Sequence, residues 1–171
     1  MLEIEQLIGF DPHTSTTESV CASVAKVFNV RPSEVGLLEL DGNLLKFVYP
    51  AELRKAGAIP LSSSAVAART ARTRRSELFN SFLRVKHSSV FEVIKLKEAG
   101  ADSTVIQKLM SVPVLSNSGD VIGVIQVSRK AERAASAGDD FTSDELRKLE
   151  SVAVVVARLM EKEKAGSGSP K

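Results

Sequence analysis

The side chains with the strongest intrinsic chemistry in this sequence are one cysteine and two histidines. Cys21 falls on the apolar face of a predicted helix, where a lone cysteine behaves as a small hydrophobe. His13 falls in a predicted loop, and His87 stands alone. A single thiol also excludes an intrachain disulfide and a metal site built from cysteines. The sequence indicates no catalytic set, and we expect no enzyme activity and no metal site.

Arginines form the second group with binding chemistry, four of them in the seven residues 69–75, followed by Arg84 and Lys86. Guanidinium groups suit carboxylates and phosphates, so one interpretation is an anion-binding mouth for a nucleotide or a carboxylate. The other is a solvated helix face and loop, which we favour because charge runs usually are solvated. No recognition module or aromatic platform accompanies the arginines, so nucleic acid is not an expected partner. The cluster consists of Arg69, Arg72, Arg74 and Arg75.

Length and composition are those of one globular domain. The chain has 171 residues, 18.4 kDa and 43% hydrophobic residues, enough for a single core. The formal net charge is +2, so no strong field favours nucleic acid. The acidic N-terminus has no signal-peptide pattern, and no apolar run is long enough to span a bilayer. We expect a cytoplasmic protein without a membrane partner.

The N-terminal half predicts two helices and then a hairpin. Residues 2–8 form a short helix, and Ser15 with Glu18 makes a capping box for the next one. Apolar runs at 35–40 and 44–49 flank a turn with strong hairpin chemistry. The second helix carries its apolar face on Val20, Cys21, Val24, Val27 and Phe28.

The middle third predicts short elements between loops. Residues 51–60 form a loop or a short helical turn, and one of the serines at 62–64 caps a short alanine-rich helix. Leu78 and Phe79 indicate a brief strand. Residues 85–98 fit a helix or a strand, and we expect the helix.

A second hairpin and a long helix follow. Apolar runs at 106–115 and 121–128 flank a polar turn with a glycine for a positive-φ position. Pro113 removes a ladder donor, so its N–H side is expected to face solvent, an edge or a bulge.

The last helix has a clear start signal. Thr142 is the predicted N-cap and Glu145 reaches back to it, while Phe141 and Leu146 occupy the hydrophobic staple positions. We predict a helix over 143–164. The domain organisation is an N-terminal segment at 1–14, one domain at 15–164 and a flexible tail at 165–171.

These C-terminal motifs resemble one known family. The run SVPVLSNSGDVIGVIQVSRK, followed by Phe141, Asp144 and Glu145, resembles the C-terminal half of a GAF domain, a small-molecule-sensing module. The resemblance implies an α+β, GAF/PAS-like fold with a central, mainly antiparallel sheet of five or six strands. Terminal helices would pack on one face, and loops with short helices on the other face would enclose a ligand pocket.

The resemblance also carries a structural signature of Asn, Lys, Phe, Asp and Glu. Here it matches as Lys130, Phe141, Asp144 and Glu145, with Arg129 where the asparagine would be. It implies that Lys130 and Asp144 pair and tie a strand to the last helix. The missing asparagine argues against cyclic-nucleotide binding.

The ligand site that the family implies falls in the middle third of the chain. Its glycine positions hold Ser64 and Ala67 or Ala68, which favour a more regular helix. Aromatic side chains there either line a pocket or fill it as core. The pocket candidates are Arg69, Phe79, Phe82, Arg84, His87 and Phe91.

The family's cofactors and its one enzymatic branch have specific requirements. Members that reduce free methionine sulfoxide need a reactive thiol and a second one to resolve it, and this chain has only Cys21. Bilin-binding members use a cysteine in the ligand-side half of the domain, and Cys21 is in another element. Haem needs an axial histidine, for which His87 would stand alone. No cofactor is required by the sequence.

Two functions remain open. The first, to which we commit, is a regulatory sensor that binds a small molecule or partner and signals through its terminal helices to a separate effector protein. Leu149 and Val156, seven residues apart, would then pack against a second copy in a homodimer. The second is a protein-interaction or dimerisation module whose pocket is filled by its own side chains.

Overall fold

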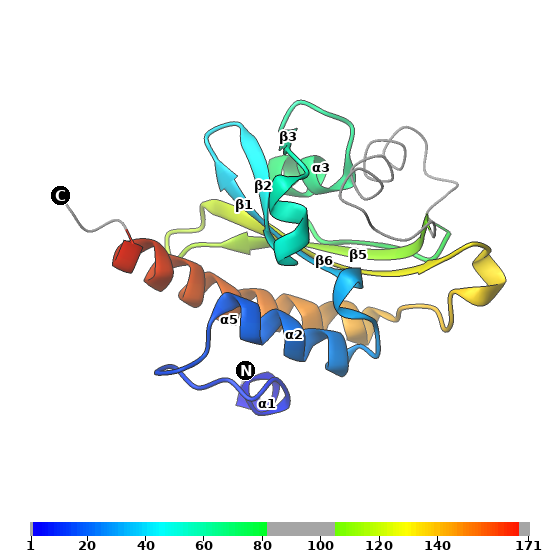
Figure 1. Ribbon diagram of the computed structural model, residues 1–171, viewed down its shortest axis with the longest axis horizontal. Coiled ribbons are helices and arrows are strands. Elements are labelled where there is room, and N and C mark those ends of the chain that lie inside the picture. Colours follow the sequence, from blue (N-terminus) through cyan, green and yellow to red (C-terminus); the bar gives the residue numbers. More distant parts are fainter. Residues whose placement is uncertain (1, 82–104, 168–171) are drawn as a thin grey trace.

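The computed structural model describes residues 2–81 and 105–167, and these build one antiparallel sheet flanked by helices (Figure 1). The strand order is β3-β2-β1-β6-β5-β4, and each pair of neighbours is antiparallel. This confirms the predicted α+β architecture with a six-stranded sheet. The strands are β1 (Val35–Asp41), β2 (Leu44–Tyr49), β3 (Ala58–Pro60), β4 (Glu77–Phe79), β5 (Val105–Leu115) and β6 (Val121–Ala131).

Helices cover the two faces of the sheet unequally. On one face, α2 (Thr17–Val27) and α5 (Ser143–Ser167) lie side by side, and α1 (Leu2–Leu7) packs against them (Figure 1). On the other face lie α3 (Val66–Thr73) and the 3₁₀ turn Ala51–Lys55. The terminal helices therefore share one face, as expected. No described helix combines the length and the apolar character that a membrane crossing requires.

The two predicted hairpins form where turn glycines allow them. Gly42 between β1 and β2 has φ +63°, and Gly119 between β5 and β6 has φ +90°. Pro113 lies beyond the three residues of β5 that pair with β4, at an open edge, as predicted. Sequence reasoning missed β3 and ended β6 three residues early, at 128. The helix expected at 85–98 lies outside the described residues.

Strand alternation decides what each face of the sheet receives. On β6, Val124 packs with the α3-side core, whereas Ile125 and Val127 pack with the larger core under α2 and α5. The same alternation directs Lys130 to the α3 side and Arg129 to the helix side. The alternation along β6 therefore decides which of its side chains face α3 and which face α2 and α5.

The helix starts confirm one predicted cap and correct two. Thr142 caps α5: its hydroxyl accepts from the backbone N–H of Glu145 at 3.1 Å, and the carboxylate of Glu145 accepts from the N–H of Thr142 at 3.0 Å. The cap of α2 is Thr16 with Ser19, one residue beyond the predicted Ser15 and Glu18. The N-cap of α3 is Ala65, not one of the preceding serines.

The predicted contact residues of α5 are not free for a second copy. Leu149 and Val156 are fully buried within the chain, because the sheet, α2 and α1 surround α5 on several sides. The two residues expected to contact a second copy are used inside the domain instead. Among apolar residues of α5, Val154 stands out as 46% exposed.

Candidate functional site

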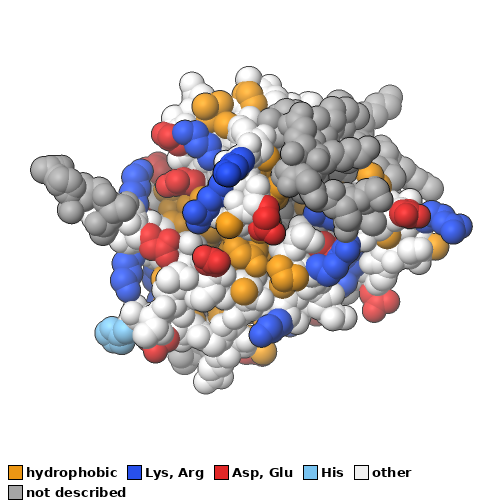
Figure 2. Space-filling model, in the orientation of Figure 1, with side chains coloured by type: hydrophobic (Ala, Val, Ile, Leu, Met, Phe, Trp, Pro, Cys, Tyr) orange, Lys and Arg blue, Asp and Glu red, His pale blue; other side chains and the backbone are white. Residues whose placement is uncertain are grey.

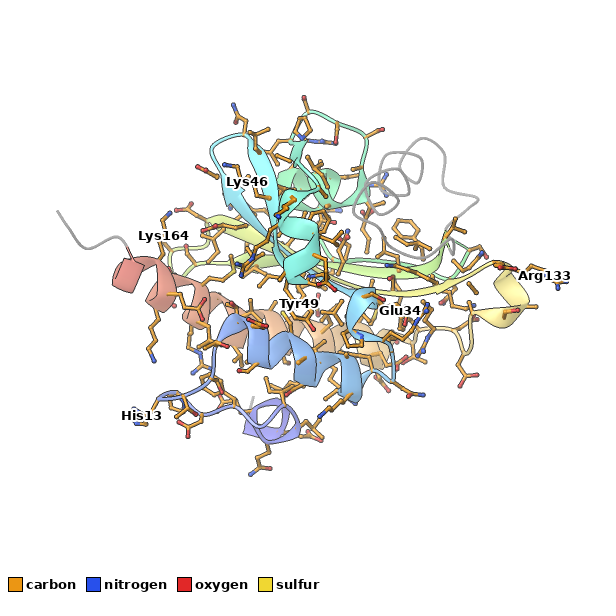
Figure 3. The ribbon with its side chains drawn as sticks, viewed as in Figure 1. His13, Glu34, Lys46, Tyr49, Arg133 and Lys164 are labelled. Carbon is orange, nitrogen blue, oxygen red and sulfur yellow. The ribbon has the colours of Figure 1, made fainter. Side chains whose placement is uncertain are left out.

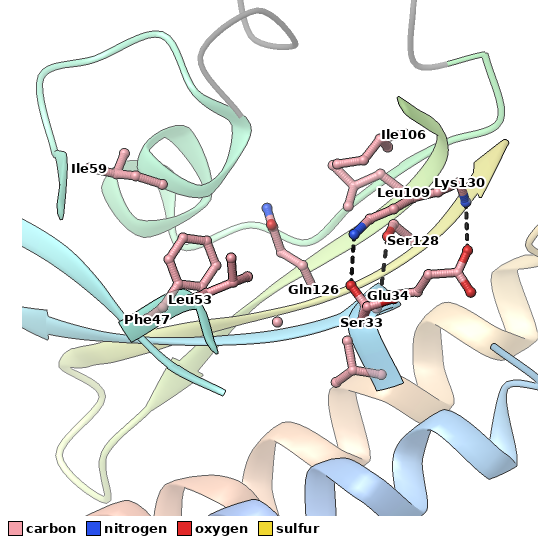
Figure 4. Close-up of a pocket in the computed structure, with 12 residues that line it drawn as sticks. Ser33, Glu34, Phe47, Leu53, Ile59, Ile106, Leu109, Gln126, Ser128 and Lys130 are labelled. Atoms are coloured by element: carbon pink, nitrogen blue, oxygen red, sulfur yellow. Dashed lines mark hydrogen bonds between the residues drawn. The ribbon is translucent and has the colours of Figure 1, made fainter. Parts of the chain in front are cut away.

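A small cavity lies between the sheet and the elements on its α3 side, where the family resemblance places a ligand pocket (Figure 4). Its volume is about 40 Å³. A buried water needs roughly 10–15 Å³ by the same measure, so the cavity has room for about three waters. Ligand pockets usually measure roughly 300–1,000 Å³. The lining consists of Ser33, Glu34, Val35, Gly36, Phe47, Leu53, Ile59, Ile106, Leu109, Gln126, Ser128 and Lys130.

One end of the cavity is polar and built around Glu34 and Lys130. Both residues are buried, with exposed fractions of 7% and 8%. The carboxylate of Glu34 accepts from the backbone N–H of Lys130 at 2.6 Å, and the Lys130 ammonium donates to Ser33 O at 2.7 Å (Figure 4). The Ser128 hydroxyl donates to Glu34 O at 3.3 Å, and Arg31 pairs with the Glu34 carboxylate at 3.3 Å. These bonds fasten the end of β6 to the 3₁₀ turn Pro32–Glu34.

A second polar chain crosses the buried surface beside α3. The Gln126 side-chain amide donates to Ser111 Oγ at 3.0 Å, and Ser111 Oγ lies 2.8 Å from Thr70 Oγ1. All three residues are buried, so the hydrogen bonds offset the cost of burying polar atoms between β6, β5 and α3. Among the described residues, Arg129 Nε is the buried side-chain nitrogen or oxygen that has no partner. The fully buried side-chain nitrogen and oxygen atoms of the described cavity lining are therefore paired within the chain.

Two of the predicted pocket residues, Arg69 and Phe79, are described. They lie against each other beside the cavity wall, and neither lines the cavity. The Arg69 guanidinium pairs with Glu77 at 2.9 Å and lies 5.7 Å from the centre of the Phe79 ring. Phe79 packs on a core cluster that includes Ile106 and Leu109, two residues of the cavity wall. Arg69 thus ties α3 to β4. The remaining candidates, Phe82, Arg84, His87 and Phe91, lie outside the described residues.

The arginine cluster divides into two pairs with different surroundings. Arg69 is engaged by Glu77, and Arg72 donates to the carbonyl oxygens of Leu61 and Ser63. Arg74 and Arg75 instead face a surface groove beside α5. The four arginines do not converge on one point, so they do not form a single anion-binding mouth.

The predicted ion pair between Lys130 and Asp144 is wrong. Alternation along β6 sends the Lys130 side chain to the face opposite α5, and exposed Asp144 pairs with Arg147 of its own helix. Arg129, rather than Lys130, connects β6 to the helices on the α5 face. It donates to Asn29 O at 3.2 Å and to Phe28 O at 3.3 Å, and it lies 4.7 Å from the centre of the Phe141 ring.

Some residues of the site were missed from the sequence. Gln126 stands in the quoted VIGVIQV motif, and alternation from Val124 would have placed it on the cavity face. Asn80, which lies outside the cavity lining and fastens the chain just before α5, had no local signal, because its partner Phe141 is 61 residues away. Its amide accepts from Phe141 N at 2.8 Å and donates to Phe141 O at 3.0 Å.

The two other reactive side chains, Cys21 and His13, occupy contrasting places. His13 is exposed in the loop between α1 and α2 (Figure 3). Cys21 is fully buried in α2, and burial, followed by the charges of Glu163 and Glu18, raises the pKa of its thiol to about 12. Only the thiolate is a nucleophile, so this thiol is inert in the folded protein.

We expect Cys21 to resist aromatic disulfide reagents in the native protein at mildly alkaline pH and to react fully in denaturant. A thiol that reacted at the rate of a free cysteine without denaturant would contradict the buried assignment. The shift also predicts a pH dependence of stability. The folded pKa is raised, so the contribution is complete below the ordinary value of 9.0 and is lost as pH rises from there toward about 12.

The control for that pH dependence is Cys21→Ala, which should flatten part of the alkaline fall in the free energy of unfolding measured in urea. A residual slope is expected from Tyr49, because burial also raises the pKa of its phenol. A profile between pH 9 and 12 that Cys21→Ala leaves unchanged would show that the thiol does not titrate with unfolding.

The sequence matches the GAF domain family over residues 13–161, and the chain therefore belongs to that family. A search of curated proteins finds no match. Solved structures with the same fold include the GAF domain of an Acinetobacter phosphoenolpyruvate-protein phosphotransferase. It is 13% identical with a TM-score of 0.71, and the alignment covers 97% of this chain and 96% of that one.

Two further similar structures come from different proteins. The GAF domain of a phosphoenolpyruvate-protein phosphotransferase from Coxiella burnetii is 10% identical, with a TM-score of 0.72 and coverage of 97% and 95%. A free methionine-R-sulfoxide reductase from Neisseria meningitidis, solved with its substrate, is 16% identical, with a TM-score of 0.64 and coverage of 96% and 88%. At these identities the likeness establishes the fold, and the fold is shared by regulatory domains and enzymes.

Proposed function

We propose that this chain is a regulatory GAF domain that acts through contacts with another protein and performs no catalytic step. The observation that carries the proposal is the cavity of about 40 Å³ whose polar lining residues Glu34, Lys130 and Gln126 hydrogen-bond within the chain. A polar ligand that took over one of these groups would break a bond already made within the chain, at a cost of roughly 1–3 kcal/mol if it is not replaced. This favours the interaction module over the small-molecule sensor.

The absence of a usable thiol supports the non-catalytic part of the proposal. Reduction of a sulfoxide oxidises a thiolate, and a second thiol must then release the product of that oxidation. Cys21 is the one cysteine in the sequence, and it is buried with a raised pKa. The chain therefore lacks the groups that a reductase of that type needs.

The small-molecule sensor remains the second candidate, favoured by the amphipathic lining of the cavity. The Lys130 ammonium and the Gln126 amide stand at one side, and apolar side chains such as Phe47 and Ile59 stand at the other (Figure 4). Such a lining would suit a small ligand with a carbonyl or carboxylate head and an apolar body. Signals would pass to the terminal helices through the sheet.

The surroundings proposed for the domain are cytoplasmic and free of nucleic acid. Lys and Arg side chains are interspersed with Asp and Glu over the described part of the face in Figure 2, which gives no continuous basic surface there. A homodimer through the terminal helices is part of the proposal. Its candidate contact is Leu7 of α1, which is 50% exposed, in place of the buried Leu149 and Val156.

Native mass spectrometry of the purified protein, followed by the same measurement under denaturing conditions, tests the proposed function. We expect the 18.4 kDa chain or its dimer without any discrete additional mass. A stoichiometric extra mass that leaves on denaturation, and that is lost in Gln126→Leu, would overturn the proposal in favour of the sensor. The matched control is Gln107→Leu. That amide donates to Ala131 O, and the residue is not among those lining the cavity.

A further inference from the structure

A surface groove runs between α5 and the segment that joins α3 to β4. Its volume is about 830 Å³, twenty times that of the cavity on the other face. The floor is the part of β5 beyond the end of β4, together with the turn that follows it. The lining consists of Arg74, Arg75, Ser76, Val112, Pro113, Leu115, Ser116, Asn117, Leu146, Glu150, Ala153, Val154, Ala157 and Arg158.

The α5 wall of the groove has the dimensions of a helix-docking surface. Its residues span Leu146 to Arg158, about 18 Å at 1.5 Å per residue, which matches about three turns of a second helix. They recur at i, i+4, i+7, i+8, i+11 and i+12, a single face of α5. Val154 is 46% exposed on this wall, and Leu115 is 39% exposed at the end of the floor. The small side chains of Ala153 and Ala157 also belong to this wall, which favours close approach of a second helix.

The charges around the groove are predominantly positive. Arg158 is already held by Glu5 at 2.8 Å, and Glu150 accepts from Ser76 at 2.6 Å. Arg74 and Arg75 are exposed, and their side chains make no hydrogen bond or ion pair within the described part of the chain. Two uncommitted guanidinium groups beside an apolar wall favour carboxylates on the occupant.

The backbone of Arg74 gives independent support. Arg74 ends α3 in the left-handed conformation, with φ +59° and ψ +31°. Glycine is the usual residue at such a helix end, because a side chain there costs stability. A non-glycine residue at a strained surface position points to a use for its side chain.

The alternatives to an acidic helix fit the groove less well. Pro113 has no N–H, so an extended peptide pairing with the open edge of β5 would lose a ladder bond there. A second copy of this chain would bring its own Arg74, Arg75 and Arg158 into the same interface, and like charges oppose such pairing.

We propose that this groove docks an acidic amphipathic helix of a partner protein, with apolar side chains against Val154 and Leu115 and carboxylates on Arg74 and Arg75. The inference rests on the proposed function, since it supplies the contact through which a regulatory domain without a ligand would act. The groove proposal can nevertheless fail while the proposed function holds, because a partner protein could dock on another surface of the domain.

The test uses a fluorescein-labelled synthetic helix of about 15 residues, with leucines at i, i+3, i+4 and i+7 and glutamates flanking them. Binding is followed by anisotropy and mapped by amide NMR shifts on the whole chain. We expect saturable binding, shifts clustered at 74–76, 112–117 and 146–158, and at least tenfold weaker binding to Arg74→Glu/Arg75→Glu. The charge-matched control Lys26→Glu/Lys55→Glu changes exposed lysines outside the groove and should bind as the wild type does.

A single variant separates binding from folding. Arg74→Gly should raise the melting temperature by about 2–4 °C, because glycine suits the left-handed backbone, and it should weaken the peptide severalfold. A destabilised protein could not give that combination.

Each other outcome overturns the groove proposal. Equal loss in the lysine control would mean nonspecific charge attraction. Shifts outside the groove, or equal binding of a peptide with lysine in place of glutamate, would remove the acidic helix as occupant. Groove shifts that appear with protein concentration alone would identify a second copy. If the peptide does not bind and native mass spectrometry finds the chain without a ligand, the groove proposal fails and the proposed function stands. If native mass spectrometry finds a retained ligand, the proposed function itself is overturned.

Discussion

Gly123→Ala is expected to destabilise the domain by about 3 kcal/mol, at the upper end of the usual cost of overpacking a core. Gly123 lies in β6 between Glu39 of β1 and Val114 of β5, the centre of the sheet. A Cβ added there would overlap the carbonyl oxygen of Leu38 and lie 3.1 Å from Met160 Cε. The methionine end can rotate away, but the β1 backbone is held on both sides by its neighbours. Chemical denaturation with urea measures the loss.

Gly36→Ala is the matched control, because this glycine also lies inside the sheet. Its added Cβ would meet Phe47 Cε1 at 3.6 Å, an ordinary contact. The substitution also removes backbone freedom from the unfolded chain, so we expect a change within about 0.5 kcal/mol, or a slight gain. If both substitutions changed the free energy of unfolding equally, the close approach of β1 to β6 would not be the reason that position 123 requires glycine.

Arg129→Ala is expected to cost about 2 kcal/mol in the free energy of unfolding. The guanidinium donates to Phe28 O and Asn29 O at the C-terminal end of α2. A positive charge at that end also interacts favourably with the helix dipole. The guanidinium lies over the Phe141 ring just before α5, at 4.7 Å from the ring centre. Charge-assisted hydrogen bonds contribute roughly 1.5–3 kcal/mol each, and the buried Nε without a partner offsets part of this.

Two companion variants sharpen the interpretation. Arg133→Ala removes an arginine that projects from the protein just beyond β6 (Figure 3), and it should change stability by less than about 0.5 kcal/mol. Arg129→Lys keeps the charge but loses the planar fork and most of the ring contact, so an intermediate loss is expected. If Arg129→Ala and Arg133→Ala change the free energy of unfolding in urea equally, the contacts of Arg129 between α2, β6 and α5 do not contribute to stability.

Local patterns were sufficient for most of the fold. The β1–β2 and β5–β6 hairpins follow from apolar runs around turns with glycine at a positive-φ position, and Thr142 with Glu145 begins α5 as predicted. The predictions that failed depended on small energy differences. Thr16 and Ser15 are both good N-caps, and packing of α2 selects between them. Strand β3 has only three residues, too few to show a period.

The candidate site could be predicted less completely. The sequence suggested Arg69 and Phe79 as pocket residues. Phe79 packs against the cavity wall and Arg69 lies over Phe79, but neither side chain lines the cavity itself. The sequence could not show that Arg69 is engaged by Glu77, or that the groove beside α5 is the larger hollow. The groove depends on residues that are distant in sequence, since Arg74 and Arg75 face residues of α5 across it.

By itself the sequence determined the class of fold, the family, the hairpins and the start of the last helix, because each rests on residues within a few positions of one another. Only the tertiary structure decided how the signature residues work. One step along β6 reverses the direction of a side chain, so Arg129 meets the helices and Lys130 meets Ser33 and Glu34 on the opposite face. Tertiary packing likewise buried Leu149 and Val156 within the domain and left Arg74 and Arg75 beside an open groove. Exposure and partnership are properties of the assembled chain, since they depend on which surfaces distant elements cover.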